Sequence, residues 1–479
     1  MGFLFYDLIF LVAFCLFITW FLYKRKKNLQ REMKIAFLYR TKVGIKFINY
    51  VGDKYKKILG VLQYISLGVG YVLMVGAIFY AVRVIYVYVR YPIMTELIKA
   101  PPLAPLIPYF PQIFGVENFF PPFYFTYFIL SFLVVAVVHE FSHGIFARYH
   151  KVRIKSTGFA FFGPFIGAFV EQDDKQMLKR KKVAQMSILS AGVFANIIFT
   201  CIFLLLWAGI FYANFTPAGA TFDGYSSSVI NISKISSIGG IAIDTPTKII
   251  EIINSQGVDY FTLDYDGLRN LTKVIAEEKS YLVPIDYLKT QLETKSEFVM
   301  LYYDFPAINA GLKGEIIEVD GKTITTHSEL AETLSEHKPN DSILIKTRHN
   351  GGVLEYEIVM GEDPNQKGRA VLGIGNNLLD MQVENTFAFF KEPFTKYNAK
   401  SELVSFLYYL VFWIFLLNLV VAFFNMLPFA IMDGGRFFYL TIWGITKSEK
   451  AAKFLCKWVG ILILFAVVLL MVVWFFRII

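Results

Sequence analysis

Residues 131–143 read Ser-Phe-Leu-Val-Val-Ala-Val-Val-His-Glu-Phe-Ser-His, an apolar run that ends in two histidines and a glutamate. A helix that continues through this run places His139 and His143 on one face, one turn apart. Two imidazoles at that spacing can bind one zinc ion. The stretch therefore predicts a metal site at the end of a helix that is apolar enough to lie in a membrane.

Glu140 follows His139 directly and lies about 100° around the helix from it. At that position its carboxylate lies beside the metal without binding it, where it can take the proton of a zinc-bound water as general base. The pattern H-E-x-x-H also arises by chance on solvated helices of soluble proteins. Inside a membrane span, ionisable groups are costly unless they are paired or hydrated, so we interpret this cluster as functional.

The whole chain has the composition of a polytopic α-helical membrane protein. Of its 479 residues, 56% are hydrophobic and only 18% are charged, which is too apolar for a soluble protein of this size. A run of roughly 20 apolar residues can cross about 30 Å of hydrocarbon. Six such runs occur, at 3–23, 58–89, 123–149, 183–213, 403–429 and 454–478. We therefore expect about six transmembrane helices in a multi-pass protein of the cell membrane.

The positive charges predict how these helices are oriented. The net charge is +9, and the lysines and arginines gather in two loops, 24–57 and 151–182. They are not interleaved with aromatic residues on a soluble surface, so we expect the lipid bilayer and no nucleic acid as partner. By the positive-inside rule both loops face the cytosol, and the long segment 214–402 lies outside. The three cysteines stand singly in predicted spans and form no metal or redox motif.

Asp433 is the clearest candidate for a third zinc ligand. It lies directly after the fifth apolar run, in Asn425-Met-Leu-Pro428-Phe-Ala-Ile-Met-Asp433-Gly434-Gly435-Arg436. The proline breaks or kinks the helix, and the glycines let the backbone approach closely. The alternative is an ordinary helix end followed by a turn. Because a zinc site needs a third protein ligand, we expect His139, His143 and Asp433 to bind one zinc ion per chain, toward the cytosolic leaflet.

These residues resemble the site-2 protease family, the zinc metalloproteases of intramembrane proteolysis. The resemblance rests on two motifs, His139-Glu140-x-x-His143 and Asn425-x-x-Pro428-x-x-x-x-Asp433-Gly434. It covers the third, fourth and fifth apolar runs, which are similar to the family's three-helix catalytic core, and it suggests an archaeal or bacterial member. It implies cleavage of single-span membrane proteins that another protease has already trimmed outside.

Two further segments are similar to parts of that family. A small re-entrant hairpin is implied after the H-E-x-x-H helix, and residues 158–171 have this pattern, with an ordinary cytosolic hairpin as the alternative. Its edge, near Gly167, would align a substrate unwound to a strand. Gly192 and Asn196 match the family's G-x-x-x-N segment. Asn196 and Asn425 are candidates for binding a substrate carbonyl or the oxyanion, and a hydrogen bond between helices is the alternative for each.

Segment 222–365 differs in composition and is predicted to be a separate soluble domain. A turn, a short strand, a tight Asp-Gly turn and a helix at 327–336 resemble a PDZ domain, an α+β fold that captures extended peptides at a sheet edge. Part of this pattern is repeated earlier in the chain. The repeat consists of a strand at 249–255 and an amphipathic helix at 266–278. Two interpretations stay open: a second PDZ-like unit, or one domain with a long insertion.

These features divide the chain into six parts. They are N-terminal helices and loops (1–122), the first part of the catalytic core (123–213), the PDZ-like domain (222–365), an interfacial linker (366–402), the second part of the core (403–441) and a C-terminal helix (442–479). The linker mixes phenylalanines with lysines, which fits a helix in the membrane interface or an ordinary linker.

The predicted function is that of a zinc-dependent intramembrane endopeptidase, with the PDZ-like domain as an outer filter for substrates. A catalytically silent membrane adaptor would be expected to lack Glu140 or one of the ligands. A zinc transporter would need carboxylates along several spans or histidine-rich loops, and this chain has only six histidines. The sequence assigns no role to the first, second and sixth apolar runs.

Overall fold

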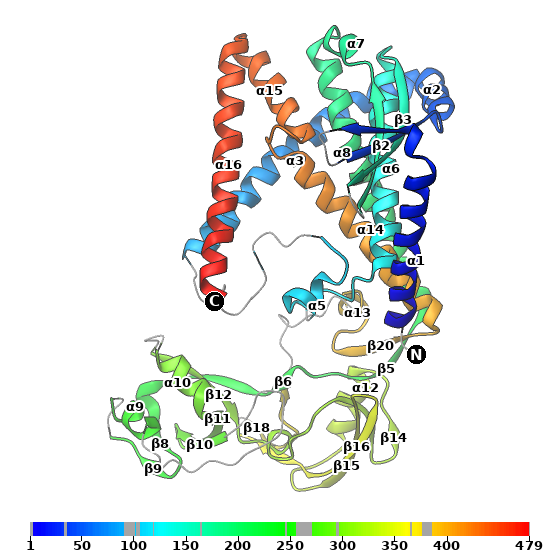
Figure 1. Cartoon of the computed structure of the whole chain (residues 1–479). Coiled ribbons are helices and arrows are strands. Elements are labelled where there is room, and N and C mark those ends of the chain that lie inside the picture. Colours follow the sequence, from blue (N-terminus) through cyan, green and yellow to red (C-terminus); the bar gives the residue numbers. More distant parts are fainter. Residues whose placement is uncertain are drawn as a thin grey trace. The chain divides into compact units, whose positions relative to one another are not determined.

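The computed structural model (Figure 1) forms two compact units, which are described separately. The helical unit comprises Met1–Ala213 and Ser401–Ile479, and the inserted unit comprises Asn214–Lys400. The structure describes residues 3–32, 36–90, 101, 106–117, 119–162, 165–244, 247–254, 271–293, 297–364, 366–375 and 386–478.

Every apolar run that the sequence marks is helical, and six of the described helices are long and apolar enough to cross a membrane. They are α1 (Phe3–Lys24), α3 (Lys56–Arg90), α6 (Phe125–Tyr149), α8 (Lys182–Asn214), α14 (Glu402–Asn425) and α16 (Glu449–Ile478). Shorter helices are α2 (Ile45–Lys54), α5 (Phe110–Phe114), α7 (Asp174–Leu178) and α15 (Asp433–Thr446). The fifth long helix ends at Asn425, earlier than predicted, because Pro428 and the residue before it disfavour helical backbone.

A four-stranded antiparallel sheet packs against α6. In spatial order its strands are β1 (Leu29–Glu32), β2 (Ala36–Thr41), β3 (Ile154–Phe162) and β4 (Phe165–Gln172). β3 and β4 form a hairpin where one was predicted, and residues 163–164 lie outside the described part. β1 and β2 come from the basic loop 24–57, for which we predicted no strands. In the described residues β4 is an edge strand, so one side of its backbone is free of strand pairing.

Asp7, a carboxylate within the apolar helix α1, holds the start of α6. The N-cap residue Tyr124 makes no side-chain hydrogen bond to the helix. Asp7 instead accepts from the backbone N–H groups of Phe125 (2.9 Å) and Thr126 (2.8 Å). The hydroxyls of Thr126 and Tyr109 also donate to it, each at 2.6 Å. Asp7 is 1% exposed, and these bonds and the positive end of the helix dipole compensate for burying its charge. The first helix thus fixes the helix that carries both histidines.

The second long helix, α3, packs against α8 and α15. The hydroxyls of Ser66 and Ser190 lie 2.7 Å apart and are fully buried. An added Cβ at Gly70 would lie 3.0 Å from the Ser190 Cβ, so the glycine permits this close approach. The ring of Tyr71 meets Phe437 of α15 edge-on, with centroids 4.9 Å apart. α3 therefore supports the helices on two sides of the site described below.

The inserted unit contains two antiparallel sheets. The first has the strand order β16-β15-β13-β5-β20, with β14 paired to β13, and the second has the order β7-β12-β11-β10-β8-β9. The first sheet and its helices comprise β5 (Phe215–Ala220), α11 (Pro306–Asn309), β13 (Glu315–Val319), β14 (Lys322–Thr323), α12 (His327–Ser335), β15 (Ser342–His349), β16 (Gly352–Val359), α13 (Ala388–Lys391) and β20 (Thr395–Ala399).

The second sheet and its helices comprise β7 (Ser227–Asn231), β8 (Ile235–Ile238), β9 (Ile241–Ala242), α9 (Thr247–Asn254), β10 (Leu271–Ala276), β11 (Lys279–Pro284), α10 (Ile285–Glu293) and β12 (Phe298–Tyr303). Two short ribbons pair β6 (Gly224–Tyr225) with β19 (Ile374–Gly375) and β17 (Gly361–Asp363) with β18 (Gln366–Val371). In the described residues the two sheets have different strand orders.

The repeat suggested by the sequence does not form the expected strand and helix. Residues 249–254 belong to helix α9, whereas their counterparts lie in strand β13. The isoleucines of α9 recur at helical spacing, and Ile249 is buried in the core of the second sheet. The predicted helix at 266–278 is strand β10 where it is described, and residues 266–270 lie outside the described part. The second sheet stands in the chain between β6 and α11, as an insertion would.

The inserted unit extends beyond the predicted domain at 222–365. β5 at its start pairs with β20 at its end, and the N–H of Lys400 donates to the carbonyl of Asn214 at 3.0 Å. Segment 366–402 thus holds strands and the four-residue helix α13 in place of an interfacial helix, and residues 376–385 lie outside the described part. Two of its aromatic residues, Phe387 and Tyr397, are 9% and 6% exposed, whereas Phe390 is 72% exposed.

Candidate metal centre and active site

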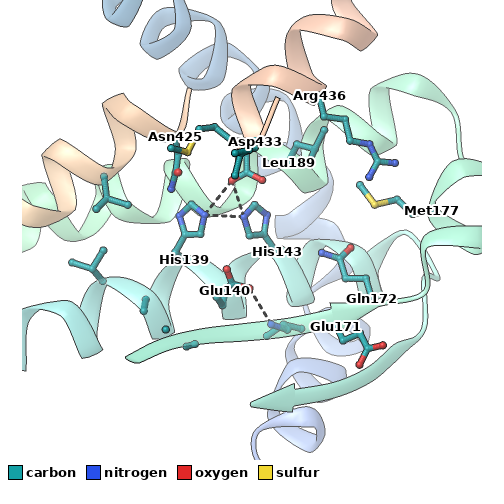
Figure 2. A pocket seen from close by; sticks show the side chains of 18 of the residues that line it. His139, Glu140, His143, Glu171, Gln172, Met177, Leu189, Asn425, Asp433 and Arg436 are labelled. Carbon is teal, nitrogen blue, oxygen red and sulfur yellow. Dashed lines mark hydrogen bonds and ion pairs between the residues drawn. The ribbon is translucent and has the colours of Figure 1, made fainter. Parts of the chain in front are cut away.

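His139, His143 and Asp433 converge at one point in the helical unit (Figure 2). The Nε2 atoms of the two histidines lie 3.0 Å apart, and they lie 3.1 and 3.2 Å from Oδ2 of Asp433. Both histidines are buried on α6, with 7% and 6% of their surface exposed. One helical turn between the histidines thus brings both imidazoles to a carboxylate that stands 294 residues after His139.

A tight turn between α14 and α15 presents Asp433, which is the first residue of α15. The next two residues pack directly on the backbone of that turn. An added Cβ at Gly434 would lie 2.3 Å from the carbonyl carbon of Met426, and one at Gly435 would lie 2.2 Å from the carbonyl oxygen of Phe429. The two glycines therefore allow the chain to turn back at once, which directs Asp433 toward α6.

The three side chains fit a zinc ion. Two imidazole nitrogens and a carboxylate oxygen are typical zinc ligands, and three protein ligands is the number found in catalytic zinc sites. With tetrahedral bonds of about 2.0–2.1 Å, two ligand atoms lie about 3.3 Å apart. The observed separations of 3.0–3.2 Å are close to this value, so one ion can be bound by all three with only small shifts.

The other ring nitrogens of both histidines face α8. Nδ1 of His143 lies 2.7 Å from the backbone carbonyl oxygen of Ile188, and Nδ1 of His139 lies 3.2 Å from the side-chain amide of Asn196. Gly192 lies between these two residues on α8. An added Cβ at Gly192 would lie 2.5 Å from Nε2 of His143 and 2.6 Å from Cε1 of His139. α8 therefore holds both imidazoles from behind, and its glycine makes room for them.

A cavity of about 650 Å³ opens on the three side chains. Glu140 lines it, and its Oε2 accepts a hydrogen bond of 2.9 Å from the backbone N–H of Val170 on β4 (Figure 2). The cavity is also lined by the β4 residues Gly167 and Ala168 and by the polar side chains of Gln172, Asp174, Asn425 and Arg436. The edge strand therefore both positions the Glu140 carboxylate and forms a wall of the cavity.

Comparison with known proteins agrees with this geometry. Residues 127–469 match the model of peptidase family M50. The chain belongs to peptidase family M50, the site-2 protease family. The match includes α6 with its two histidines and α15 with Asp433, and it confirms the resemblance seen in the sequence. Family membership and the six apolar helices together indicate a membrane metallopeptidase.

An uncharacterized protein of Methanocaldococcus jannaschii is similar to this M50 peptidase over 195 residues, with 29% identity. The similar region covers 40% of this chain and 48% of the relative. The chain thus matches about half the length of that protein.

The predicted site residues fall in two groups in this M50 peptidase. Glu140, Gly167 and Asn425 are among the residues that line the cavity. Asn196 lies elsewhere: its side chain is fully buried behind His139 and does not line the cavity, which corresponds to the alternative of a hydrogen bond between helices. It faces the histidine because Gly192 lets α8 approach α6 so closely.

Sequence reasoning missed several contributors to the site. Arg436 lines the cavity one turn after Asp433 on α15, and its i, i+3 spacing is a signal that was available. Asp7 could have been noticed as a lone carboxylate in an apolar run. Val170 contributes its backbone N–H, and the residue type gives no indication of such a contact.

His150 directly follows the last residue of α6 and has a partner on α8. Its Nε2 lies 2.8 Å from the hydroxyl of Ser187 on α8. Burial, together with the charge of Arg180, lowers the pKa of His150 to about 4. The imidazole is therefore neutral at physiological pH, and its hydrogen bond connects the end of α6 to α8.

Replacing Gly192 with alanine should weaken metal binding. The new methyl group overlaps both imidazoles, so the ligand atoms must separate, and we expect zinc affinity to fall on the order of tenfold or more. Competition with a chelator on the purified protein measures this. Gly209→Ala is the matched control on the same helix, because nothing lies within 4 Å of its added Cβ. If Gly192→Ala bound zinc as tightly as Gly209→Ala, the packing argument would fail.

Proposed function

We propose that this M50 peptidase is a zinc-dependent intramembrane endopeptidase that hydrolyses peptide bonds in or near the transmembrane segments of its substrates. The observation that carries the proposal is the convergence of His139, His143 and Asp433 beside Glu140, in a cavity among helices of membrane-spanning length. Ionisable groups buried in such helices are costly and indicate function. Membership of the peptidase family supports the chemistry.

The proposed reaction is hydrolysis by water with Glu140 as general base. His139, His143 and Asp433 would hold a zinc ion, which activates water and polarises the scissile carbonyl. Because the Val170 N–H holds Oε2 of Glu140, Oε1 is left to take a proton from the attacking water and pass it to the leaving nitrogen. Asn425 lines the cavity, and we assign its amide to the developing oxyanion.

The substrate is proposed to bind as an extended strand along β4. Within a helix each scissile carbonyl is hydrogen-bonded and screened by side chains, so the segment must unwind before it is cleaved. Among the described residues no further strand pairs with the outer edge of β4, which reaches the cavity near Gly167 and Ala168. A substrate segment that pairs with this edge runs past Glu140. Because Gly167 has no Cβ, it leaves space for the substrate side chains beside it.

The active site is proposed to lie toward the cytosolic leaflet of the cell membrane. Both basic loops, 24–57 and 151–182, are assigned to the cytosol by the positive-inside rule. His143 lies about two helical turns before the second loop. The polar cavity residues Gln172, Asp174 and Arg436 favour entry of water from that side. The inserted unit then lies outside the membrane.

The inserted unit is proposed to act as a PDZ-like filter for single-span substrate proteins. The resemblance at residues 305–336 supports this role, as does a sheet whose path ends in the edge strands β16 and β20. An edge strand can bind an extended chain end by backbone hydrogen bonds. A filter of this kind admits substrates with a short outer segment and disfavours bulky ectodomains.

Glu140→Gln should stop proteolysis without removing the metal. Glutamine keeps the shape of the side chain but accepts no proton, so we expect the cleavage rate to fall by about 10² to 10⁴. The measurement is cleavage of a single-span test substrate, with zinc per chain determined on the same sample. Cleavage at the wild-type rate would exclude Glu140 as the base, and loss of zinc would identify it as a ligand.

Excising the inserted unit should relax selection against large ectodomains. Because Lys400 and Asn214 are hydrogen-bonded at 3.0 Å, a short Gly/Ser linker can replace residues 215–399 and join α8 to α14. The measurement is the ratio of cleavage rates for one transmembrane segment with and without a bulky ectodomain. We expect a ratio near one after excision and a much smaller ratio in the full chain.

The control for this experiment is the zinc content of the excised protein, which should equal that of the full chain. An unchanged preference for short ectodomains in a zinc-loaded excised protein would remove the filter role while leaving the protease assignment intact.

A further inference from the structure

The amide of Asn196 is a contact that the proposed chemistry leaves unexplained. Its side chain is fully buried on α8, with the amide nitrogen 3.2 Å from Nδ1 of His139. In this orientation the amide oxygen has no hydrogen-bond partner among the described residues. The oxygen and nitrogen of an amide occupy equivalent positions, so a half-turn of the terminal group exchanges them without moving other atoms.

The atom that faces His139 decides which ring nitrogen carries the proton. A neutral imidazole has one N–H and one lone pair. If the amide N–H donates to Nδ1, the proton is on Nε2, which then has no lone pair for a metal. If the amide oxygen faces Nδ1, the proton is on Nδ1, and Nε2 offers its lone pair at the point that it shares with His143 and Asp433.

His143 already has the second arrangement, in which Nδ1 carries the proton and Nε2 has the lone pair. Nδ1 of His143 lies 2.7 Å from the carbonyl oxygen of Ile188. A carbonyl oxygen only accepts hydrogen bonds, so Nδ1 of His143 carries a proton and its Nε2 is the ligand atom. Two histidines that bind one ion through Nε2 each need an acceptor at Nδ1. For His143 that acceptor is the backbone of α8.

We propose that Asn196 supplies the acceptor for His139: its amide oxygen takes the Nδ1–H and fixes the ring as an Nε2 ligand. The inference rests on the proposed zinc site and makes Asn196 a positioning residue that does not contact the substrate. Gly192 and Asn196 lie one turn apart on the same face of α8. The first leaves space for the imidazoles, and the second holds one of them in the required orientation.

The effect on metal binding follows from burial. Asn196 is fully buried, so without its amide the ring of His139 would be free to turn or to carry its proton on Nε2. Partners behind metal-binding histidines are typically worth 10- to 100-fold in metal affinity.

The experiment measures zinc affinity of the purified full chain by chelator competition, which does not depend on proteolysis. Asn196→Ala removes the acceptor and should weaken zinc binding by about 10- to 100-fold. Asn196→Asp has nearly the same shape and, as a carboxylate, only accepts hydrogen bonds, so its zinc affinity should stay within about threefold of wild type. Thr200→Val is the control: it removes a buried hydroxyl one turn further along, which donates to the Asn196 backbone carbonyl.

Unchanged zinc affinity in Asn196→Ala overturns the proposal. A loss in Asn196→Asp as large as that in Asn196→Ala also overturns it, because His139 would then need a donor. If thermal unfolding shows that Asn196→Ala does not fold, Asn196→Asp decides alone, and a loss of tenfold or more refutes the accepting role. A wild-type chain without zinc would refute the proposed function itself, and this inference with it.

Discussion

The carboxylate of Asp433 must reach two imidazoles inside a bundle of apolar helices, and much of the helical unit is arranged around that contact. Unpaired polar groups are costly in such an interior, so His139 and His143 are tolerated there only with partners on every nitrogen. Asp433 supplies the shared partner at 3.1 and 3.2 Å. To bring it there, the chain leaves α14 at Asn425 and starts α15 eight residues later, at Asp433 itself.

Each neighbouring element holds a different part of this contact. α8 contacts the far side of both imidazoles through the Ile188 carbonyl and Asn196, with Gly192 leaving room. β4 holds the Glu140 carboxylate by a backbone N–H, and Asp7 of α1 caps the helix on which Glu140 stands. α3 packs behind α8 and α15. The sequence left the roles of α1 and α3 open. Both helices pack against elements that carry or contact the metal-binding residues.

The sequence predicts what depends on local spacing and misses what depends on partners. Hydropathy identifies the six helices, and the i, i+4 spacing places both histidines on one face. The strands β1 and β2 were missed because β2 pairs with β3, which lies far along the chain, and β1 joins the sheet only through β2. The run at 249–254 was misread because isoleucines suit strands, although their spacing is helical. A buried asparagine such as Asn196 is expected to form a hydrogen bond. Its partner, His139, becomes known only from the packing of α8 on α6.

Two distant parts of the chain are proposed to bind one zinc ion together. Metal analysis of the purified wild-type protein, Asp433→Ala and Asp174→Ala tests this. Asp174 lines the same cavity but does not belong to the cluster of His139, His143 and Asp433, so its variant is the matched control. We expect about one zinc per chain in the wild type and in Asp174→Ala, and almost none in Asp433→Ala. Full zinc content in Asp433→Ala would exclude Asp433 as a ligand.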